Sequence, residues 1–352
     1  MKTIIKYLEQ HLGESLPFVL YAKPNSSNLI GFFQQDYSIH QTTDFLDRGF
    51  VFAPFDAGQQ VFFPEHACEI IKDTLDFEVP SGQFEDFVPT QTVKEAHEAL
   101  VQKGIDAIKA GTFHKVVLSR REDIPVADLN FLAMYQRLLQ TYPTAFRYCF
   151  FHPQIGLWMG ATPEQLLKKD GQHIATVSLA GTQVDQGITP TVWGTKEQEE
   201  QQIVTDFITK ALDAHCTQVQ ATAPHTAKAG SLLHLKSEIQ GVLKTPEDFV
   251  AVLKALHPTP ALCGLPKAAA RDFINAEEGY PREYYAGFLG ELNRNYENQE
   301  PETADLYVNL RCVQLKYNAV QLYLGGGITA DSHPTAEFWE TVNKSQTIKK
   351  IL

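Results

Sequence analysis

Short apolar runs separated by turn residues dominate the first 90 residues of the chain. The segments LPFVLYAKPNSS, NLIGFFQQ and GFVFAPFDAGQQVFFPE each combine aromatic and aliphatic residues with Gly, Pro, Asn or Asp. Runs of this length between turn residues are typical of strands joined by hairpins. We therefore expect residues 1–90 to be rich in strands.

A change of pattern follows. The stretch PSGQFEDFVPTQ, residues 80–91, is polar and contains Gly and Pro, which is typical of a connector. After it, Val101, Ile105 and Ile108 recur at the spacing of one helix face, and Gly111 is a residue type that commonly ends a helix. We predict a helix over roughly 92–110, followed directly by a strand with the sequence FHKVVLSR.

Beyond residue 140, strand patterns are interspersed with helical ones. The strand-like segments are AFRYCFFHP, GLWMGAT, HIATVSLAGT, DLYVNLRCVQLKY and AVQLYLGGGI, and helical patterns cover the 190s to 214, 247–256 and 334–350. The segment LKYNAV predicts a hairpin. Because strands adjoin strands, the pattern favours an α+β fold with antiparallel pairing. The chain contains neither GxGxxG after a strand nor GxxxxGK[ST], so a nucleotide-binding fold has no support.

The composition is that of a globular protein and limits the classes of partner. Of the 352 residues, 43% are hydrophobic and 20% are charged, and the formal net charge is −12. An acidic chain without a Lys/Arg block lacks the basic surface that nucleic acid binding requires. An anionic ligand would have to be held by a local group of cations, because the overall charge repels it.

Neither export nor membrane insertion is expected. The N-terminal segment MKTIIKYLEQHLGE carries too many charges for a signal peptide, and no apolar run approaches the roughly 20 residues that cross a bilayer. The cysteines form no CxxC pair, which favours reduced thiols in a cytoplasmic protein and argues against a zinc site. They are Cys68, Cys149, Cys216, Cys263 and Cys312.

The C-terminal segment GGGITADSHPTAEFWETVNKSQTI contains candidate site residues. Its glycines, residues 325–327, end an apolar strand and would let backbone N–H groups approach a ligand, as in a carboxylate-binding turn. In the following helix one face would carry Glu337, Glu340, Thr341 and Lys344. This face is either a solvated polar surface with a Glu–Lys pair or a paired-carboxylate site for Mg²⁺.

Three shorter motifs contain further candidates. In FHKVVLSR, Lys115 interrupts an apolar strand and is either an edge-strand charge or a functional amine. In WMGATPEQLL, Glu164 follows Pro163 and by itself would complement the dipole at a helix start. The segment SLAGT, residues 178–182, predicts a turn of small residues.

Together these segments resemble the chorismate-binding enzymes, a family that includes isochorismate, salicylate, anthranilate and aminodeoxychorismate synthases. The resemblance rests on KVVLSR, GATPEQL, SLAGT, HLKSEIQG, LHPTPALCGLP, EGYPREYYAG, LRCVQL and GGGITADSHPTAEFWET, in this order over roughly residues 92–350. It implies a single large domain with mainly antiparallel sheets packed in layers and flanked by helices. Residues 91–352 would form the catalytic region, and residues 1–90 a strand-rich part of the same fold, by analogy only.

The resemblance also implies a role for each matching residue. Lys115 resembles the general base that activates water, and Glu164 the general acid that protonates the departing hydroxyl. The residues that resemble Mg²⁺ ligands are Glu200, Glu337 and Glu340. Glu199, next to Glu200, leaves that assignment open by one residue. Positions that resemble the substrate-binding ones are Ala180, Gly181, Thr182, His234, Thr259, Tyr285, Arg311, Gly326, Gly327 and Lys344.

Two positions favour water as the nucleophile. Family members that use ammonia generally lack the lysine present as Lys115, and aminodeoxychorismate synthases carry a lysine where this chain has Ala180. We therefore expect Mg²⁺-dependent conversion of chorismate to isochorismate by a monomeric enzyme. Salicylate synthesis, which adds the elimination of pyruvate, is the first alternative. An anthranilate or aminodeoxychorismate synthase component and a catalytically silent chorismate-binding protein are others. The use of the product, in menaquinone, siderophore or salicylate formation, stays open.

Overall fold

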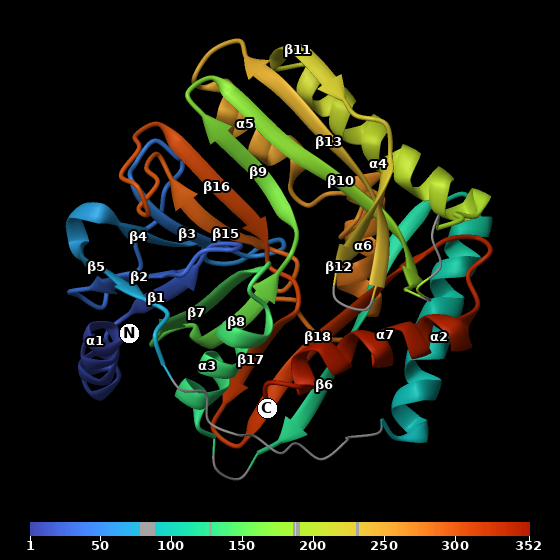
Figure 1. Cartoon of the computed structure of the whole chain (residues 1–352). Coiled ribbons are helices and arrows are strands. Elements are labelled where there is room, and N and C mark those ends of the chain that lie inside the picture. The colour runs from blue at the N-terminus through green and yellow to red at the C-terminus, as the bar shows by residue number, and fades with distance from the viewer. Residues whose placement is uncertain (78–88, 127–128, 186, 188–190, 230–231) are drawn as a thin grey trace.

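Two antiparallel β-sheets form the frame of the protein (Figure 1). The computed structural model describes residues 1–77, 89–126, 129–185, 187, 191–229 and 232–352. Within these ranges the chain forms the two sheets, seven α-helices and a short 3₁₀ helix, Glu65–Ala67. The predicted α+β class with antiparallel pairing is confirmed.

The first sheet contains strands from both ends of the chain. In hydrogen-bonded order its strands are β14 (Gly264–Leu265), β6 (Lys115–Pro125), β18 (Ala319–Ile328), β17 (Cys312–Lys316), β8 (Gly156–Thr162), β7 (Phe146–His152), β1 (Phe18–Ala22), β2 (Asn28–Gln34) and β5 (Cys68–Thr74). The predicted hairpin in LKYNAV joins β17 to β18, where Lys316 pairs with Ala319.

The second sheet also combines strands from distant parts of the chain. Its strands are β11 (Cys216–Ala221), β13 (Leu232–Leu243), β10 (His173–Val184), β9 (Gln165–Asp170), β16 (Thr303–Val308), β15 (Phe288–Leu292), β3 (Gly49–Ala53) and β4 (Val61–Pro64), with β12 (His225–Ala229) paired to β13. Strand β1 pairs with β7 and β3 with β15, so the first part of the chain contributes to both sheets.

Strand β1 shows how the hydrophobic core is divided. Its side chains are all buried and alternate between two clusters. Val19 and Tyr21 belong to the cluster between the sheets, and the Tyr21 ring lies 4.9 Å from that of Phe50 in β3. Phe18 and Leu20 pack on the outer side with α1 (Lys2–Glu14) and α3 (Phe131–Thr141). A strand covered on both faces is apolar throughout, which explains the continuous run FVLYA.

The remaining helices pack on the two sheets and on one another. Helices α2 (Gln91–Lys109) and α7 (Pro334–Lys349) contact each other and strand β18. Helix α4 (Thr195–Asp213) packs on β10 and β13, α5 (Asp248–Leu256) touches α4, and α6 (Lys267–Glu277) packs on β14 and β6. No helix in the described ranges is long and apolar enough to cross a membrane.

The predicted helix over 92–110 is confirmed as α2. Thr90 accepts a hydrogen bond from the Val93 amide at its N-terminus, and Gly111 follows its end with a φ of 80°. The helices over 195–213, 248–256 and 334–349 are confirmed too, whereas α1, α3 and α6 were not predicted. Residues 80–88 of the predicted connector lie outside the described residues.

Truncating Phe52 tests the core between the sheets. Its ring stacks on Phe150 at 4.1 Å and on Tyr284 at 4.4 Å, so Phe52→Ala removes contacts to both sides. We expect the free energy of unfolding in urea to fall by about 3–5 kcal/mol. Tyr317→Ala, at a side chain that is 94% exposed, should change it by less than about 0.5 kcal/mol. Equal effects would contradict this description of the core.

Candidate active site

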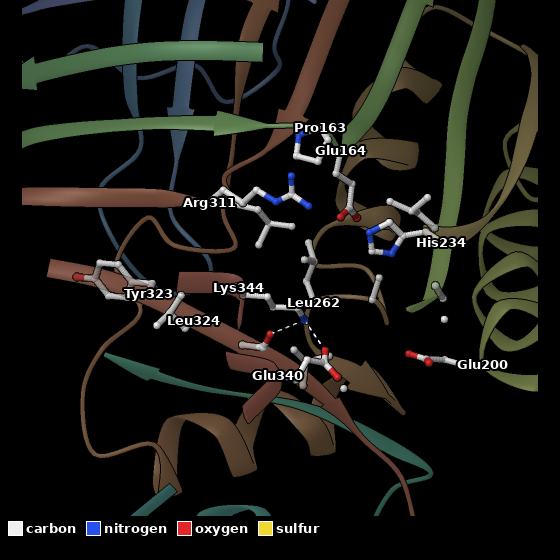
Figure 2. Close-up of a pocket in the computed structure, with 18 of the residues that line it drawn as sticks. Pro163, Glu164, Glu200, His234, Leu262, Arg311, Tyr323, Leu324, Glu340 and Lys344 are labelled. Carbon is white, nitrogen blue, oxygen red and sulfur yellow. Dashed lines mark hydrogen bonds and ion pairs between the residues drawn. The ribbon is translucent and has the colours of Figure 1, made fainter. Parts of the chain in front are cut away.

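A cavity of about 190 Å³ lies where the two sheets, α4 and α7 meet (Figure 2). Most of the predicted site residues line it, although they come from separate parts of the chain. They are Lys115, Glu164, Ala180, Gly181, Glu200, His234, Tyr285, Arg311, Gly327, Glu337, Glu340 and Lys344. The fold therefore brings these residues together around one cavity.

Two adjacent connections between the sheets bring Glu164 and Arg311 together. Residues 163–164 join β8 of the first sheet to β9 of the second, and residues 309–311 join β16 back to β17. The two connections bind each other: the Val308 amide donates to the Glu164 carbonyl at 2.9 Å, and the Ala161 amide to the Arg311 carbonyl at 3.2 Å. The helix start considered for Glu164 is therefore wrong, because the chain passes from strand to strand.

The environment of Glu164 favours its protonated form. Burial raises the pKa of this carboxyl to about 7, against an ordinary value of 4.5, and the positive charges of Arg311, Lys115 and Lys344 act in the opposite direction. Figure 2 shows the carboxyl group close to the ring of His234, with the Arg311 guanidinium beside them. Burial lowers the pKa of His234 to about 4, so this imidazole is neutral near pH 7. Glu164 can therefore donate a proton at neutral pH.

Lys115 is buried at the first position of β6. It is 2% exposed, and Leu265 of β14 pairs with it, so the edge of β6 is covered at this point. The edge-strand role considered for Lys115 is wrong for this reason. Its Nζ lies 2.5 Å from a carboxylate oxygen of Glu200, which extends from α4 into the same cavity. Lys115 is therefore an interior amine facing an acidic residue.

The three glycines lie within strand β18 and do not form the predicted turn. Residues 325–327 pair with Ser119, Leu118 and Val117 of β6. A Cβ on Gly327 would lie 3.2 Å from Oε1 of Glu200 and 3.1 Å from Cε of Lys115. The missing side chains thus leave room for charged groups next to the strand.

Gly326 stands next to the acidic residues of α7. A Cβ at this position would lie 3.4 Å from Oε2 of Glu337 and 3.8 Å from Oε1 of Glu340. Gly326 itself is not among the residues that line the cavity. The carboxylates of α7 therefore approach Gly326, and the carboxylate of Glu200 on α4 approaches the next residue, Gly327.

This acidic face of α7 is partly buried, and it contains the Glu–Lys pair that the sequence left open. Glu337 is 6% exposed and accepts a hydrogen bond from Ser332 at 2.7 Å. Glu340 pairs with the ammonium of Lys344 at 2.7 Å, and Lys344 also donates to the Gly325 carbonyl at 2.9 Å, as Figure 2 shows. Both the carboxylates and the lysine are therefore turned toward the cavity.

The carboxylates of α4 and α7 are chemically suited to a magnesium ion. Hard divalent cations prefer carboxylate oxygen, and Glu200, Glu337 and Glu340 supply it from two helices around Gly326 and Gly327. As these side chains stand, no three His, Cys, Asp or Glu residues of the described ranges are grouped closely enough to hold an ion. Of the two neighbouring glutamates, Glu200 lines the cavity and Glu199 is exposed.

Glu197 also lines the cavity and was missed in the sequence. It precedes Glu200 by one helical turn, the spacing that separates Glu337 from Glu340, so a search for two Glu-x-x-Glu pairs would have found it. Glu197 packs against Gly181: a Cβ on this glycine would lie 3.0 Å from that of Glu197. Gly181 has a φ of 70° and lies in a bulge of β10, so the predicted SLAGT turn is part of a strand.

Comparison with known proteins agrees with this geometry. The sequence profile of the family described as chorismate binding enzyme matches residues 69–352. The chain belongs to the chorismate-binding enzyme family. It is therefore a chorismate-utilising enzyme, and chorismate is the substrate that this membership implies.

Individual members of the chorismate-binding family resemble the chain to a similar degree. Isochorismate synthase EntC of Escherichia coli K12 is 28% identical over 75% of this chain and 68% of its own length. Anthranilate synthase component 1 of Aeropyrum pernix is 29% identical over 74% of this chain and 61% of its own. The crystal structure of DhbC from Bacillus anthracis, 24% identical, superposes with a TM-score of 0.79 over 98% of both chains. Sequence identity alone does not choose between the reactions of the family.

Two predicted substrate-binding positions of this family member need separate comment. Thr259 is buried but does not line the cavity, because its carbonyl accepts hydrogen bonds from the amides of Leu262 and Cys263 in a tight turn. This turn presents Ala261 and Leu262 to the cavity instead. Thr182 lies in β10, but its side chain falls outside the described residues. Tyr285 lines the cavity, stacked 5.4 Å from Tyr323.

The raised pKa of Glu164 predicts a pH-dependent loss of stability. Between pH 4.5 and about 7 the folded protein holds a proton on Glu164 that the unfolded chain releases. Stability therefore falls as the pH rises through this window, and above it the loss remains in full but no longer changes with pH. The Glu164→Gln variant has no carboxyl group at this position and does not lose stability in this way. The Tm of the variant minus that of the wild type should therefore increase from about pH 5 to about pH 8. A difference in Tm that does not change with pH would contradict the buried, protonated carboxyl.

Proposed function

We propose that this chorismate-utilising enzyme is an isochorismate synthase. The observation that carries the proposal is that an amine, Lys115, and a carboxyl group with a pKa of about 7, Glu164, line one cavity. Lys115 comes from a strand of the first sheet, and Glu164 from a connection between the two sheets. The reaction adds water at C2 of chorismate and releases the C4 hydroxyl as water. It therefore needs a base for one proton and an acid for another.

Glu164 is the proposed acid. Hydroxide is a poor leaving group, so the C4 oxygen must receive a proton as its bond to carbon breaks. A carboxyl group that is half protonated near pH 7 can supply that proton at neutral pH. The positive charges of Arg311 and Lys344 nearby would then stabilise the carboxylate that remains.

Lys115 is the proposed base. The attacking water loses one proton to the amine as its oxygen bonds to C2, so the proton taken up balances the one that Glu164 gives. Lys115 starts β6 in the first sheet, whereas Glu164 stands on the connection to the second. Residues on separate elements can approach different faces of a small ring, which neighbours in sequence could not do.

The charged residues around them suit a dicarboxylate. Arg311 and Lys344 would hold the carboxylates of chorismate in a chain whose net charge is otherwise −12. Glu200, Glu337 and Glu340 would hold Mg²⁺. When bound there, the ion would fix the ring carboxylate and withdraw charge from it. The neutral His234 and the small Ala180 would leave space for water beside the ring.

Product analysis tests this proposal directly. Purified enzyme with chorismate and Mg²⁺ should accumulate isochorismate, resolved by chromatography, and EDTA should stop the reaction. Salicylate and pyruvate appearing at the rate of chorismate loss would instead make the protein a salicylate synthase. A product that forms only when ammonia is supplied would show that the protein is one of the amine-transferring members of the family. If chorismate is not converted at all, the protein would be a chorismate-binding protein without catalytic activity.

Substitution of the proposed acid and base gives the next prediction. Lys115→Gln and Glu164→Gln should each lower kcat by about 10²–10⁴, because each removes one proton-transfer group. Lys103→Gln is the matched control, since this lysine is 62% exposed and pairs with Glu277 on the surface. Rates are to be measured with saturating chorismate and Mg²⁺. A kcat within a factor of about three of the wild type for either active-site variant would remove that residue from the mechanism.

A further inference from the structure

Helix α7 supplies three polar residues to the cavity, but no apolar stripe fixes its rotation. Of its large apolar residues, Trp339 is 47% exposed, and only Phe338 and Ile348 are buried. The other buried positions are Glu337, Thr341, Ser345 and Lys349. A helix is normally oriented by burial of a continuous apolar face, which α7 lacks. Its orientation must therefore depend on polar contacts.

Two neighbouring rows of side chains on α7 have different surroundings. The cavity row is Glu337, Glu340, Lys344 and Ile348. The anchoring row is Phe338, Thr341, Ser345 and Lys349, all buried. The second row is the first shifted by one residue, which corresponds to a rotation of about 100°. A change in the rotation of α7 would therefore move the carboxylates away from the cavity.

Strand β6 holds the anchoring row through buried charges. Arg120 donates from Nε to the Thr341 hydroxyl at 2.7 Å and from Nη1 to Oε2 of Glu122 at 2.8 Å. The ammonium of Lys349 lies 2.6 Å from Oε1 of Glu122. The guanidinium of Arg120 also lies over the ring of Phe338, 5.4 Å from its centre. Glu122 thus connects two contacts two helical turns apart on α7.

None of these side chains lines the cavity. Arg120, Glu122, Thr341 and Lys349 are each 5% exposed or less, and they are absent from the cavity wall. Strand β6 also carries Lys115, five residues before Arg120. The contacts therefore join the strand of the proposed base to the helix of the proposed metal ligands.

We propose that Arg120, Glu122, Thr341 and Lys349 are positioning residues that set the rotation of α7 and so direct Glu337 and Glu340 to the cation. The proposal rests on the proposed function, in which these glutamates hold Mg²⁺. Groups that orient metal ligands typically contribute about 10–100-fold to metal affinity. Loss of the anchor should therefore weaken Mg²⁺ binding although no ligand is changed.

The chain contains matched controls. Arg121 and Asp123, the next residues on β6, form an Arg–acid pair of the same spacing at 3.3 Å, but both are more than a third exposed. Asp123→Asn therefore removes the same kind of pair from the surface. On α7, Thr341→Ser keeps the hydroxyl that Arg120 binds, whereas Thr341→Val removes it at nearly constant shape.

The test is Mg²⁺ binding to the full-length protein, measured by titration calorimetry without substrate. Thr341→Val and Glu122→Gln should raise the dissociation constant for Mg²⁺ about tenfold. Thr341→Ser and Asp123→Asn should leave it within about twofold. A folded Thr341→Val with wild-type Mg²⁺ affinity overturns the proposal, whatever its effect on Tm, and this variant decides the matter if Glu122→Gln does not fold.

The Mg²⁺-binding experiment and the product analysis test the two proposals separately. The identity of the product tests the reaction in the wild type, whereas the affinity difference between variants tests the anchor. A product other than isochorismate, together with the expected order of Mg²⁺ affinities, would overturn the reaction and support the positioning role. Isochorismate formation, together with equal Mg²⁺ affinities of the wild type and the variants, would support the proposed reaction and overturn the positioning role.

Discussion

The cavity depends on one constraint, the contact between two of the connections that join the sheets. The connections from β8 to β9 and from β16 to β17 lie side by side, and the backbone hydrogen bonds from Val308 to Glu164 and from Ala161 to Arg311 tie them together. A carboxyl and a guanidinium thereby stand at the boundary between the sheets, where side chains from each sheet can reach them. Every other group of the site is arranged around this fixed pair.

Burial of charge gives the site its chemical character. Desolvation raises the pKa of Glu164 to about 7 and lowers that of His234 to about 4, although the cations nearby oppose the first shift. The cavity therefore combines a protonated acid and a neutral imidazole with lysine, arginine and carboxylate side chains. An acidic protein can bind a dianion in this way, because short-range contacts inside a cavity outweigh the repulsion of a distant, screened surface.

Much of the secondary structure could be predicted from the sequence because it is local. The spacing of Val101 and Ile105 predicts α2, and the LKYNAV segment predicts its hairpin. The helix α1 was missed although Ile4 and Leu8 occupy one face, because the segment was considered only as an export signal. Its charged residues suit an amphipathic helix.

The site was harder to predict because its residues acquire their surroundings from distant elements. From the sequence, glycines 325–327 resemble a turn, but in the structure they pair with β6. Glu164 resembles the start of a helix, but in the structure strand β9 follows it. The motif resemblance still indicated residues that mostly line one cavity. Thr259 and Gly326 do not line it, and in the case of Thr259 one turn places Leu262 in the wall instead.

The central claim is that water attacks one carbon of the ring while the hydroxyl leaves another. Turnover in water labelled with oxygen-18, followed by mass spectrometry of the product, tests this most directly. The account predicts isochorismate with a single labelled oxygen, at the C2 hydroxyl. Unlabelled isochorismate would mean that the original hydroxyl moves within the molecule, which would contradict the separate roles of Lys115 and Glu164.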